Sequence, residues 1–252
     1  MRSAGTTPRG AAGEQQAARW VQGMFGRVAR RYDLLNHLLS FQLDKRWRAY
    51  TVKQVGEVLR RPGARVLDLC CGTGDLMLAL ERARGGPVMG SDFCHPMLIE
   101  AQRKSGRRRA ATALVNADAL EMPMADGSLD LITVAFGFRN FANYRKGLRE
   151  LRRLLRAGGC LAILEFSQPP NRVFAALYGF YSRVVLPRVG ALISGDREAY
   201  TYLPESVEKF PGPEELAAEM RAAGFDRVRF DRLTFGIVAL HLGYVDGKEE
   251  AR

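Results

Sequence analysis

The stretch VLDLCCGTGDL, Val66 to Leu76, decides how the rest of the chain is interpreted. Its first four residues are a short apolar run typical of a buried strand, and the residues from Leu76 onward have the apolar spacing of a helix. Between these two elements the chain turns through Gly72 and Gly74. Glycines let backbone N–H groups approach a ligand closely, and a helix N-terminus favours electron-rich groups. The stretch therefore predicts a strand–turn–helix unit that binds a ligand.

Asp92 indicates which kind of ligand binds there. It lies twenty residues beyond Gly72, at the end of a second short strand from Pro87 to Ser91. A carboxylate in that place usually accepts hydrogen bonds from the two hydroxyls of a ribose, so we infer a nucleoside cofactor. A dinucleotide fingerprint would have a third glycine three residues after Gly74, where this chain has Met77, which disfavours a pyrophosphate.

The turn also has an acidic residue in front of its glycines. Asp68 ends the first strand, where it would face a ligand's amino group better than a phosphate. The pattern Asp-x-x-x-Gly-x-Gly after a strand is similar to the S-adenosylmethionine (SAM) loop of class I methyltransferases. A turn used only for strand–helix packing would not require Asp68, Gly72, Gly74 and Asp92 to agree on one site. Their agreement favours SAM as the cofactor.

Length and composition are those of one α/β domain. The 252 residues are 47% hydrophobic, which is enough for one substantial core. Four cysteines without metal-ligand spacing or a disulfide-like framework fit a reducing cytoplasm. We see no signal peptide and no apolar stretch near the ~20 residues that span a bilayer. Residues 1–18 are small and polar and are expected to be disordered, and residues 19–252 are expected to form a single domain.

The net charge of +11 has three possible explanations: RNA binding, attraction to an anionic membrane, or general solubility. The arginines are scattered, and the tight cluster at residues 107–109 lies between predicted elements. No basic stripe with interleaved aromatic residues is present. We therefore expect no nucleic acid partner, and we interpret the charge as solvated surface with weak attraction to a membrane.

Strands and helices alternate along most of the chain. The expected strands are 65–69, 87–91, 112–116, 129–135, 159–165, 226–232 and 235–242, with helices near 74–84, 96–105, 144–155 and 213–223. This alternation predicts a parallel sheet covered on both faces, and the short connection between the last two strands predicts an antiparallel hairpin. The fold class is therefore α/β: a Rossmann-like, seven-stranded, mostly parallel sheet of the class I SAM-dependent methyltransferase type. Ligands of such sheets bind at the carboxyl ends of the strands.

Two segments fall outside this alternation. Apolar residues at helical spacing from Met24 to Leu39 predict helices that pack on the sheet, cover the cofactor, or do both, with Tyr32, Asp33 and Asn36 turned toward the site. Another amphipathic helix is expected from about Ala49 to Arg60. Residues 166–212 are too long for an ordinary connection and are rich in aromatic and aliphatic residues. We expect a helical insertion after strand five, which either contacts a long apolar substrate or only packs onto the domain.

Several stretches, from about Gln22 to Gly243, together resemble the ubiquinone/menaquinone biosynthesis C-methyltransferases. They include YDLLNHLLS, FGFRN and GDREAY, which are far more specific than the glycine loop. The resemblance implies SAM contacts at Thr73, at Asp92, and at Asp118 with Ala119. For Asp118 alone, a helix N-cap is the commoner explanation.

The chain departs from the family pattern at two places. Ala135 stands where some members carry a serine, which removes one hydrogen bond to the cofactor. The segment SFQLDKRWR replaces a more familiar Gly-x-His pattern and leaves the substrate preference open. The resemblance implies SAM-dependent C-methylation of a polyprenylated quinol, either demethylmenaquinol, the benzoquinol precursor of ubiquinone, or both. An RNA methyltransferase, a non-catalytic SAM-binding module and an NAD-dependent dehydrogenase are the alternatives.

A quinol ring carbon becomes nucleophilic when its neighbouring hydroxyl loses a proton, so the site must stabilise a phenolate and carry protons away. Arg139 and Asn140 follow strand four, and an arginine with a pKa above ~12 suits phenolate stabilisation better than the role of base. The candidate bases are Tyr32, Asp33, Glu165, Asp196 and His241, or a water molecule held by one of them. Glu165 could instead cap a neighbouring backbone, Asp196 could form a structural ion pair, and His241 could be a core histidine.

The isoprenoid tail of such a substrate partitions into lipid. We therefore expect a cytoplasmic protein that makes transient contact with the inner face of the cell membrane. The sequence leaves a homo-oligomer possible.

Overall fold

The computed structural model describes residues 5–8, 10–29, 32–106, 113–185, 188 and 197–247. The candidate base Asp196 and the arginine cluster at 107–109 lie outside these residues. Within the described chain, none of the helices is long and apolar enough to cross a membrane.

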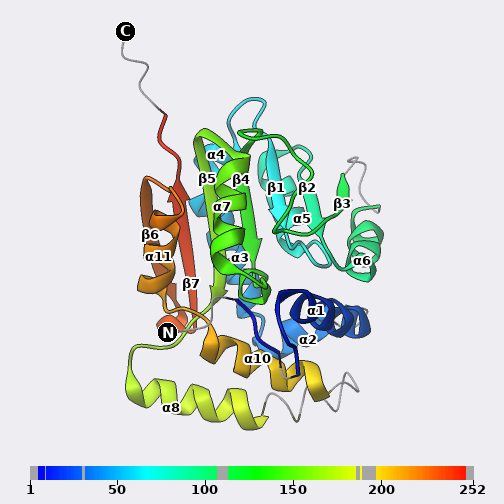
Figure 1. The fold of residues 1–252 in the computed structure, drawn as a ribbon, viewed down its shortest axis with the longest axis vertical. Helices are drawn as coiled ribbons and strands as arrows, with labels where there is room; N and C mark the ends of the chain where they lie inside the picture. The colour runs from blue at the N-terminus through cyan, green and yellow to red at the C-terminus, as the bar shows by residue number, and fades with distance from the viewer. Residues whose placement is uncertain are drawn as a thin grey trace.

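A seven-stranded sheet with the order β3-β2-β1-β4-β5-β7-β6 organises the described residues (Figure 1). Neighbouring strands from β3 to β5 pair in parallel, and β7 is antiparallel to both β5 and β6. The predicted fold class, including the C-terminal antiparallel hairpin, is confirmed. The strands are β1 (Val66–Leu69), β2 (Met89–Asp92), β3 (Leu114–Asn116), β4 (Leu129–Ala135), β5 (Leu155–Phe166), β6 (Arg227–Leu233) and β7 (Val238–Tyr244).

Helices cover both faces of the sheet, because its central strands are apolar on both sides. One core lies between the sheet and the helices α7 (Tyr144–Leu154) and α11 (Pro213–Ala222), which are in front of the sheet in Figure 1. The other core lies between the sheet and α3 (Leu43–Gln54), α4 (Gly56–Leu59) and α5 (Asp75–Arg84). The sixth helix, α6 (His95–Ser105), follows β2 and contacts β2 and β3.

The N-terminal part is more ordered than its composition predicts. Helix α1 spans Glu14–Val28, and its buried residues Ala17 and Val21 extend the apolar face toward the N-terminus. Thr6 donates its backbone N–H to the carbonyl of Phe141 at 2.8 Å, and its hydroxyl lies 2.7 Å from that of Tyr202. Part of the segment predicted to be disordered therefore lies in α1 or contacts the domain in this structure, and its disorder in solution stays a prediction. Small side chains there pack closely, although they give no strong hydrophobic signal.

The helix predicted from about Ala49 to Arg60 begins earlier and is divided. Helix α3 starts at Leu43, directly after the short helix α2 (Tyr32–Leu39) and a tight turn. Phe41 and Gln42 in this turn have φ angles of 51° and 60°, in the left-handed region that favours glycine. The polar sequence around Asp44 concealed the first turn of α3.

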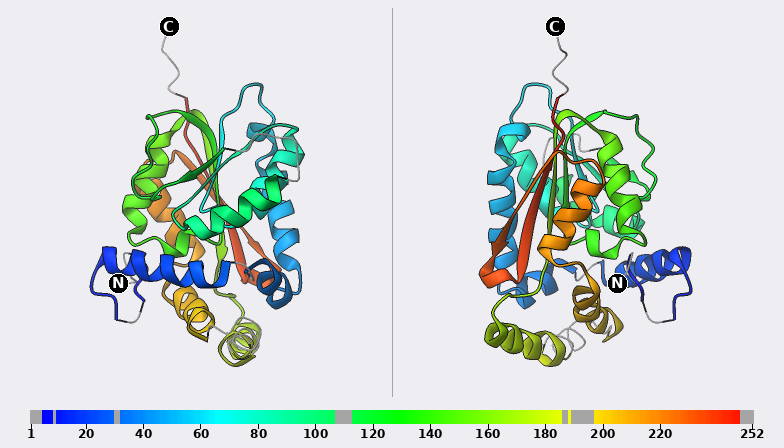
Figure 2. Two further views of the ribbon diagram at one scale, coloured as in Figure 1. Left: turned by 90° about the vertical axis from the view of Figure 1, so that its right-hand side faces the viewer. Right: turned by 60° about the vertical axis from the view of Figure 1, so that its left-hand side comes forward.

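The insertion after β5 is helical, as predicted. It contains α8 (Arg172–Phe180), a π-helical turn (Tyr181–Val185) and α10 (Arg197–Lys209). Figures 1 and 2 show α1, α2, α8 and α10 gathered beyond one end of the sheet. Four helices from two distant segments therefore enclose the same region.

Candidate active site

Two adjoining cavities lie at the carboxyl ends of the parallel strands. The smaller, which we name the inner cavity, has a volume of about 80 Å³. Five of the residues predicted to bind the cofactor line it, together with side chains of α1 and α2. These five residues are Gly72, Asp92, Asp118, Ala119 and Ala135. The sheet thus brings together residues that are up to 63 positions apart in the sequence (Gly72 to Ala135).

The glycine loop has an open face toward the inner cavity. Gly72 has a φ of 53°, and a Cβ added to it would meet no atom within 4 Å. The Asp92 carboxylate accepts the backbone N–H groups of Gly72 at 2.9 Å and of Cys94 at 2.8 Å. Burial raises the pKa of Asp92 to about 6. The loop and the end of β2 are therefore held together, and a ligand can approach the loop backbone without obstruction.

Asp118 makes a local turn contact and also lies at the inner cavity, and its contact with a cofactor stays a prediction. Its Oδ1 accepts the backbone N–H of Leu120 at 2.9 Å, which is a cap-like contact, and the residue also lines the inner cavity. The neighbouring Ala119 is buried and also lines the inner cavity. Ala135 contributes only a Cβ at the end of β4.

Three predicted cofactor residues take other positions. Among the described residues, Asp68, Thr73 and Gly74 line neither cavity. Asp68 accepts the hydroxyl of Thr133 at 2.6 Å, and burial raises its pKa to about 7. Gly74, with a φ of 87°, directly precedes α5. These three residues belong to the loop or the strand before it but do not face either cavity. Their direct contact with a cofactor stays a prediction.

Asp33 likewise lines neither cavity, and its carboxylate makes polar contacts elsewhere. Its carboxylate accepts the hydroxyl of Thr73 and pairs with the ammonium group of Lys104. Lys104 also contacts Asp75 at 2.8 Å. The expectation that Asp33 turns toward the site is not met in this structure, because Lys104 of α6 holds its carboxylate.

The larger cavity, which we name the outer cavity, has a volume of about 550 Å³. Its walls come from α1, α2, α3, α8 and α10 and from the ends of β4 and β5. Phe25, Tyr32 and Phe136 line both cavities, so the two spaces share a wall. A pocket of this size and apolar lining is typical of a small-molecule site.

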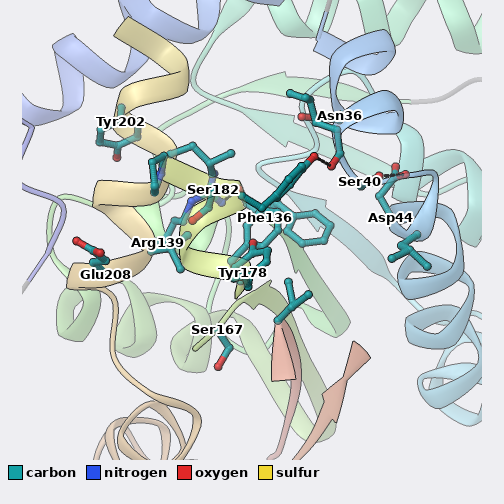
Figure 3. A pocket seen from close by; sticks show the side chains of 18 of the residues that line it. Asn36, Ser40, Asp44, Phe136, Arg139, Ser167, Tyr178, Ser182, Tyr202 and Glu208 are labelled. Carbon is teal, nitrogen blue, oxygen red and sulfur yellow. Dashed lines mark hydrogen bonds between the residues drawn. The ribbon is translucent and has the colours of Figure 1, made fainter. Parts of the chain in front are cut away.

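Arg139 is the buried cation of the outer cavity (Figure 3). Its guanidinium donates to Glu165 at 2.8 Å and to the carbonyl of Phe136 at 2.6 Å, and it lies 5.3 Å from the ring centroid of Phe166. The adjacent Asn140 lines the inner cavity and accepts the hydroxyl of Tyr202 at 2.9 Å. The FGFRN run therefore places the charged Arg139 at the outer cavity and the amide of Asn140 at the inner cavity.

The remaining candidate bases differ in their surroundings. Tyr32 lines both cavities, and burial raises its pKa, although Arg139 opposes that shift. Glu165 is 1% exposed and is engaged by Arg139 and by the backbone N–H of Phe166, so it holds the arginine rather than facing a ligand. His241 is 2% exposed on β7 and bonds to the carbonyl of Pro213, and burial lowers its pKa to about 4. It is a core histidine.

Sequence reasoning missed a second polar wall of the outer cavity. Ser40, Asp44 and Arg48 all line this cavity. Asp44 and Arg48 are four residues apart on α3, a spacing that places them on one face of that helix, and Ser40 lies in the turn before it. The signal was present in SFQLDKRWR, but the segment was interpreted only as a departure from a family pattern.

The fold and the two cavities define a class of protein: a nucleoside-binding α/β enzyme of the class I methyltransferase type. Solved structures with this fold include a SAM-dependent methyltransferase from Thermotoga maritima, described as a possible histamine N-methyltransferase. It is 17% identical, with a TM-score of 0.59 over 88% of this chain and 98% of that one. A SAM-dependent methyltransferase from Aquifex aeolicus is 20% identical, with a TM-score of 0.55 over 77% of this chain and 88% of that one.

Sequence comparison narrows the class further. The profile of the ubiE/COQ5 methyltransferase family matches residues 11–245, so the chain belongs to this family. A demethylmenaquinone methyltransferase of Thermus thermophilus is 53% identical over 87% of this chain and 99% of the relative. The protein of the same name from Deinococcus radiodurans is 47% identical over 91% of this chain and 94% of the relative. The family resemblance predicted from the sequence is confirmed.

Proposed function

We propose that this protein transfers the methyl group of SAM to a ring carbon of demethylmenaquinol, in menaquinone biosynthesis. The observation that carries the proposal is the wall shared by the inner and outer cavities, since donor and acceptor must meet there. Relatives named demethylmenaquinone methyltransferase, at 40–53% identity over most of the chain, support the naphthoquinol as substrate. The benzoquinol precursor of ubiquinone is the second candidate, because the sequence resemblance covers enzymes of both the ubiquinone and the menaquinone pathways.

The inner cavity has the polar groups that SAM requires. Asp92 would accept the ribose hydroxyls, Asp118 the adenine amine above Ala119, and the Gly72 backbone would hold the methionyl end. SAM supplies a methyl group that is already activated by its sulfonium. The cavity's 80 Å³ is smaller than the ~300 Å³ of usual ligand pockets, so its walls must adjust when SAM binds.

The protein contributes alignment and charge. Arg139 would stabilise the phenolate oxygen of the substrate, since its guanidinium is buried beside the shared wall and is held by Glu165. Tyr32 stays protonated at neutral pH because burial raises its pKa, so it positions the ring as a hydrogen-bond donor. The apolar side chains of Phe136 and Phe166 keep water away from the reacting carbon. Residues 166–212 act as the substrate-side insertion.

The direct experiment supplies the purified protein with SAM labelled in its methyl group. Three acceptors are compared: demethylmenaquinol in detergent, the ubiquinone benzoquinol precursor, and total RNA. We expect label in menaquinol, identified by mass spectrometry as a gain of one methyl on the ring. Label in RNA, or SAM binding without any transfer to either quinol, would refute the proposal.

Asp92 provides a test of the cofactor site with two opposite readouts. Its pKa of about 6 lies above the ordinary 3.8, so the folded protein favours the protonated form and ionisation costs stability as the pH rises. Asp92→Asn removes this cost, which amounts to about 3 kcal/mol at 1.36 kcal/mol per pKa unit. Between pH 4 and pH 7, the free energy of unfolding of the variant should therefore rise relative to wild type by up to this amount.

The same Asp92→Asn variant should bind SAM at least about tenfold more weakly, because an amide is a poorer acceptor for two hydroxyls. Chemical denaturation across this pH range and calorimetric SAM titration measure the two effects. Asp226→Asn is the control, since Asp226 is exposed, is not among the predicted cofactor residues and lines neither cavity. Unchanged SAM affinity in Asp92→Asn would remove Asp92 from the cofactor site.

We further propose transient docking of the outer-cavity rim on an anionic phospholipid bilayer. Seven large apolar side chains on α2, α8 and two turns are 49–78% exposed, and we name them the apolar rim: Leu34, Leu38, Phe41, Val173, Leu177, Phe180 and Phe235. Phe41 lines the outer cavity and lies 5.9 Å from the ring of Tyr181, which joins α2 to α8. A substrate tail leaving the cavity would therefore meet this surface. The net charge of +11 favours an anionic partner.

Leu177→Glu with Phe180→Glu should abolish sedimentation of the protein with vesicles that contain anionic phospholipid, because charged groups replace apolar ones at the interface. Ile99→Glu is the matched control: Ile99 is 38% exposed on α6, outside the apolar rim. Methylation of a short-tailed quinol in solution should stay near the wild-type rate in both variants. Vesicle binding that persists after both substitutions would exclude this face as the docking surface.

A further inference from the structure

A carboxylate faces the outer cavity from the wall opposite Arg139. Figure 3 shows Asn36, Ser40 and Asp44 on one side of Phe136, and Arg139 on the other side. Asp44 belongs to the first turn of α3 and is 3% exposed, although it lines a cavity of about 550 Å³. The cavity therefore has a donor group on one wall and an acceptor group on the other.

The Asp44 carboxylate has acceptor capacity left. Its Oδ2 is contacted by His37 at 2.7 Å and by the guanidinium of Arg48, and its Oδ1 accepts the hydroxyl of Ser40 at 2.8 Å. A carboxylate offers about four acceptor positions, two on each oxygen. The contacts of the described residues occupy both positions on Oδ2 and one on Oδ1. Among the described residues no hydrogen bond fills the remaining position on Oδ1, and Asp44 lines the cavity, so a ligand could use this position.

Asp44 is ionised at neutral pH. Burial raises its pKa, but Arg48, Ser40 and His37 more than offset this effect, so the pKa lies below 3.8. The charged groups around it are Arg48 on its own helix, His37 on α2, and Asp75 of α5, which lies 3.7 Å from His37 and 3.9 Å from Arg48. An ionised carboxylate accepts hydrogen bonds and cannot donate one.

We propose that Asp44 determines the redox specificity of the site by accepting a hydrogen bond from a hydroxyl of the reduced quinol at Oδ1. This inference rests on the proposed function, because it requires a quinol in the outer cavity. A 1,4-quinol has two hydroxyl groups on opposite sides of its ring. The first meets Arg139, and the second meets Asp44.

The oxidised quinone lacks the proton that Asp44 needs. Its carbonyl oxygen would face the ionised carboxylate as a second acceptor and would be left buried without a donor on that side, and sites built in this way discriminate strongly. Arg139 cannot make the distinction, since a guanidinium donates equally well to a hydroxyl oxygen and to a carbonyl oxygen. Only the quinol has the nucleophilic ring carbon, so this selection keeps an unreactive ligand out of the site.

The test is anaerobic calorimetric titration of a short-tailed prenyl-1,4-naphthoquinone, as the quinone and after reduction by dithionite. We expect wild type to bind the reduced form at least about tenfold more tightly, the usual effect of a hydrogen bond to a charged group. Asp44→Asn can donate to a carbonyl, so it should bind the quinone more tightly, bind the quinol more weakly, and lower the ratio at least about tenfold. Asp75→Asn is the matched control: it belongs to the same ion network but lines neither cavity, and it should keep the ratio.

Asp44→Asn leaves Arg48 without its nearest partner, so the double variant with Arg48→Gln repeats the measurement with both charges removed. Equal binding of the two redox forms by wild type, or an unchanged ratio in both variants, would overturn the role of Asp44. If wild type binds neither form, the proposed function itself fails, which is a distinct result.

Discussion

Replacing Arg139 with alanine is expected to lower turnover about 10²–10³-fold while SAM binding is retained. Arg139 lines the outer cavity and contributes no side chain to the inner one among the described residues. It is the buried cation nearest to the proposed phenolate, and loss of a single preorganised donor typically costs about 10²–10³ in kcat. Methyl transfer to demethylmenaquinol and calorimetric titration with SAM measure the two properties separately. Turnover at the wild-type rate would remove Arg139 from the mechanism.

The Arg139→Ala variant also needs a control for loss of stability. Arg139 and Glu165 form an ion pair at 2.8 Å with both side chains buried, and removal of one member of such a pair costs about 3–5 kcal/mol. The double variant Arg139→Gln/Glu165→Gln removes both charges and keeps the volume of the two side chains. It should unfold closer to wild type than Arg139→Ala and still transfer methyl groups at the lowered rate. Recovery of turnover together with stability in the double variant would mean that Arg139 acts only in folding.

The sheet could be predicted because its physical signal is local. Apolar runs of four to seven residues alternate with helical spacing, and the central strands β1 and β4 are buried on both faces. Gly72 and Asp92 were predicted to share one site because strand ends of a parallel sheet meet at one edge, and both line the inner cavity. The hairpin prediction paired β6 with β7, but it did not say which of the two strands lies next to β5. The structure shows that β7 lies between β5 and β6.

The second polar wall could not be predicted in the same way. Asp44 lines the outer cavity only because the chain turns at Phe41 and Gln42, between α2 and α3. This turn places Asp44 across the cavity from Arg139, although the two residues are almost a hundred positions apart in the sequence. Asp33 was expected in the site on the basis of helical spacing, yet Lys104 of α6 holds it elsewhere. Periodicity assigns a residue to a face of a helix, whereas the neighbours of that face depend on long-range packing.

A methyl group added at Gly137 is expected to close the inner cavity. The Cβ of an alanine there would lie 2.5 Å from the Cβ of Cys70, closer than real Cβ contacts allow, and both residues line this cavity. The φ of Gly137 is −111°, so the glycine is required for space and not for its backbone conformation. Gly137→Ala should weaken SAM binding at least about tenfold and destabilise the fold by about 1–3 kcal/mol, as overpacking usually does.

The substitution that removes the clash provides the decisive control. Cys70→Gly deletes the opposing Cβ, and it also places a glycine where the φ is 53°, a conformation that is unfavourable for cysteine. The double variant Gly137→Ala/Cys70→Gly should therefore regain SAM affinity and stability, with a coupling energy that a double-mutant cycle measures. Gly86→Ala, whose added Cβ would lie 3.6 Å from its nearest neighbour, should change neither property. If the double variant binds SAM no better than Gly137→Ala alone, the packing of the β1 loop against the end of β4 does not determine the shape of the cofactor site.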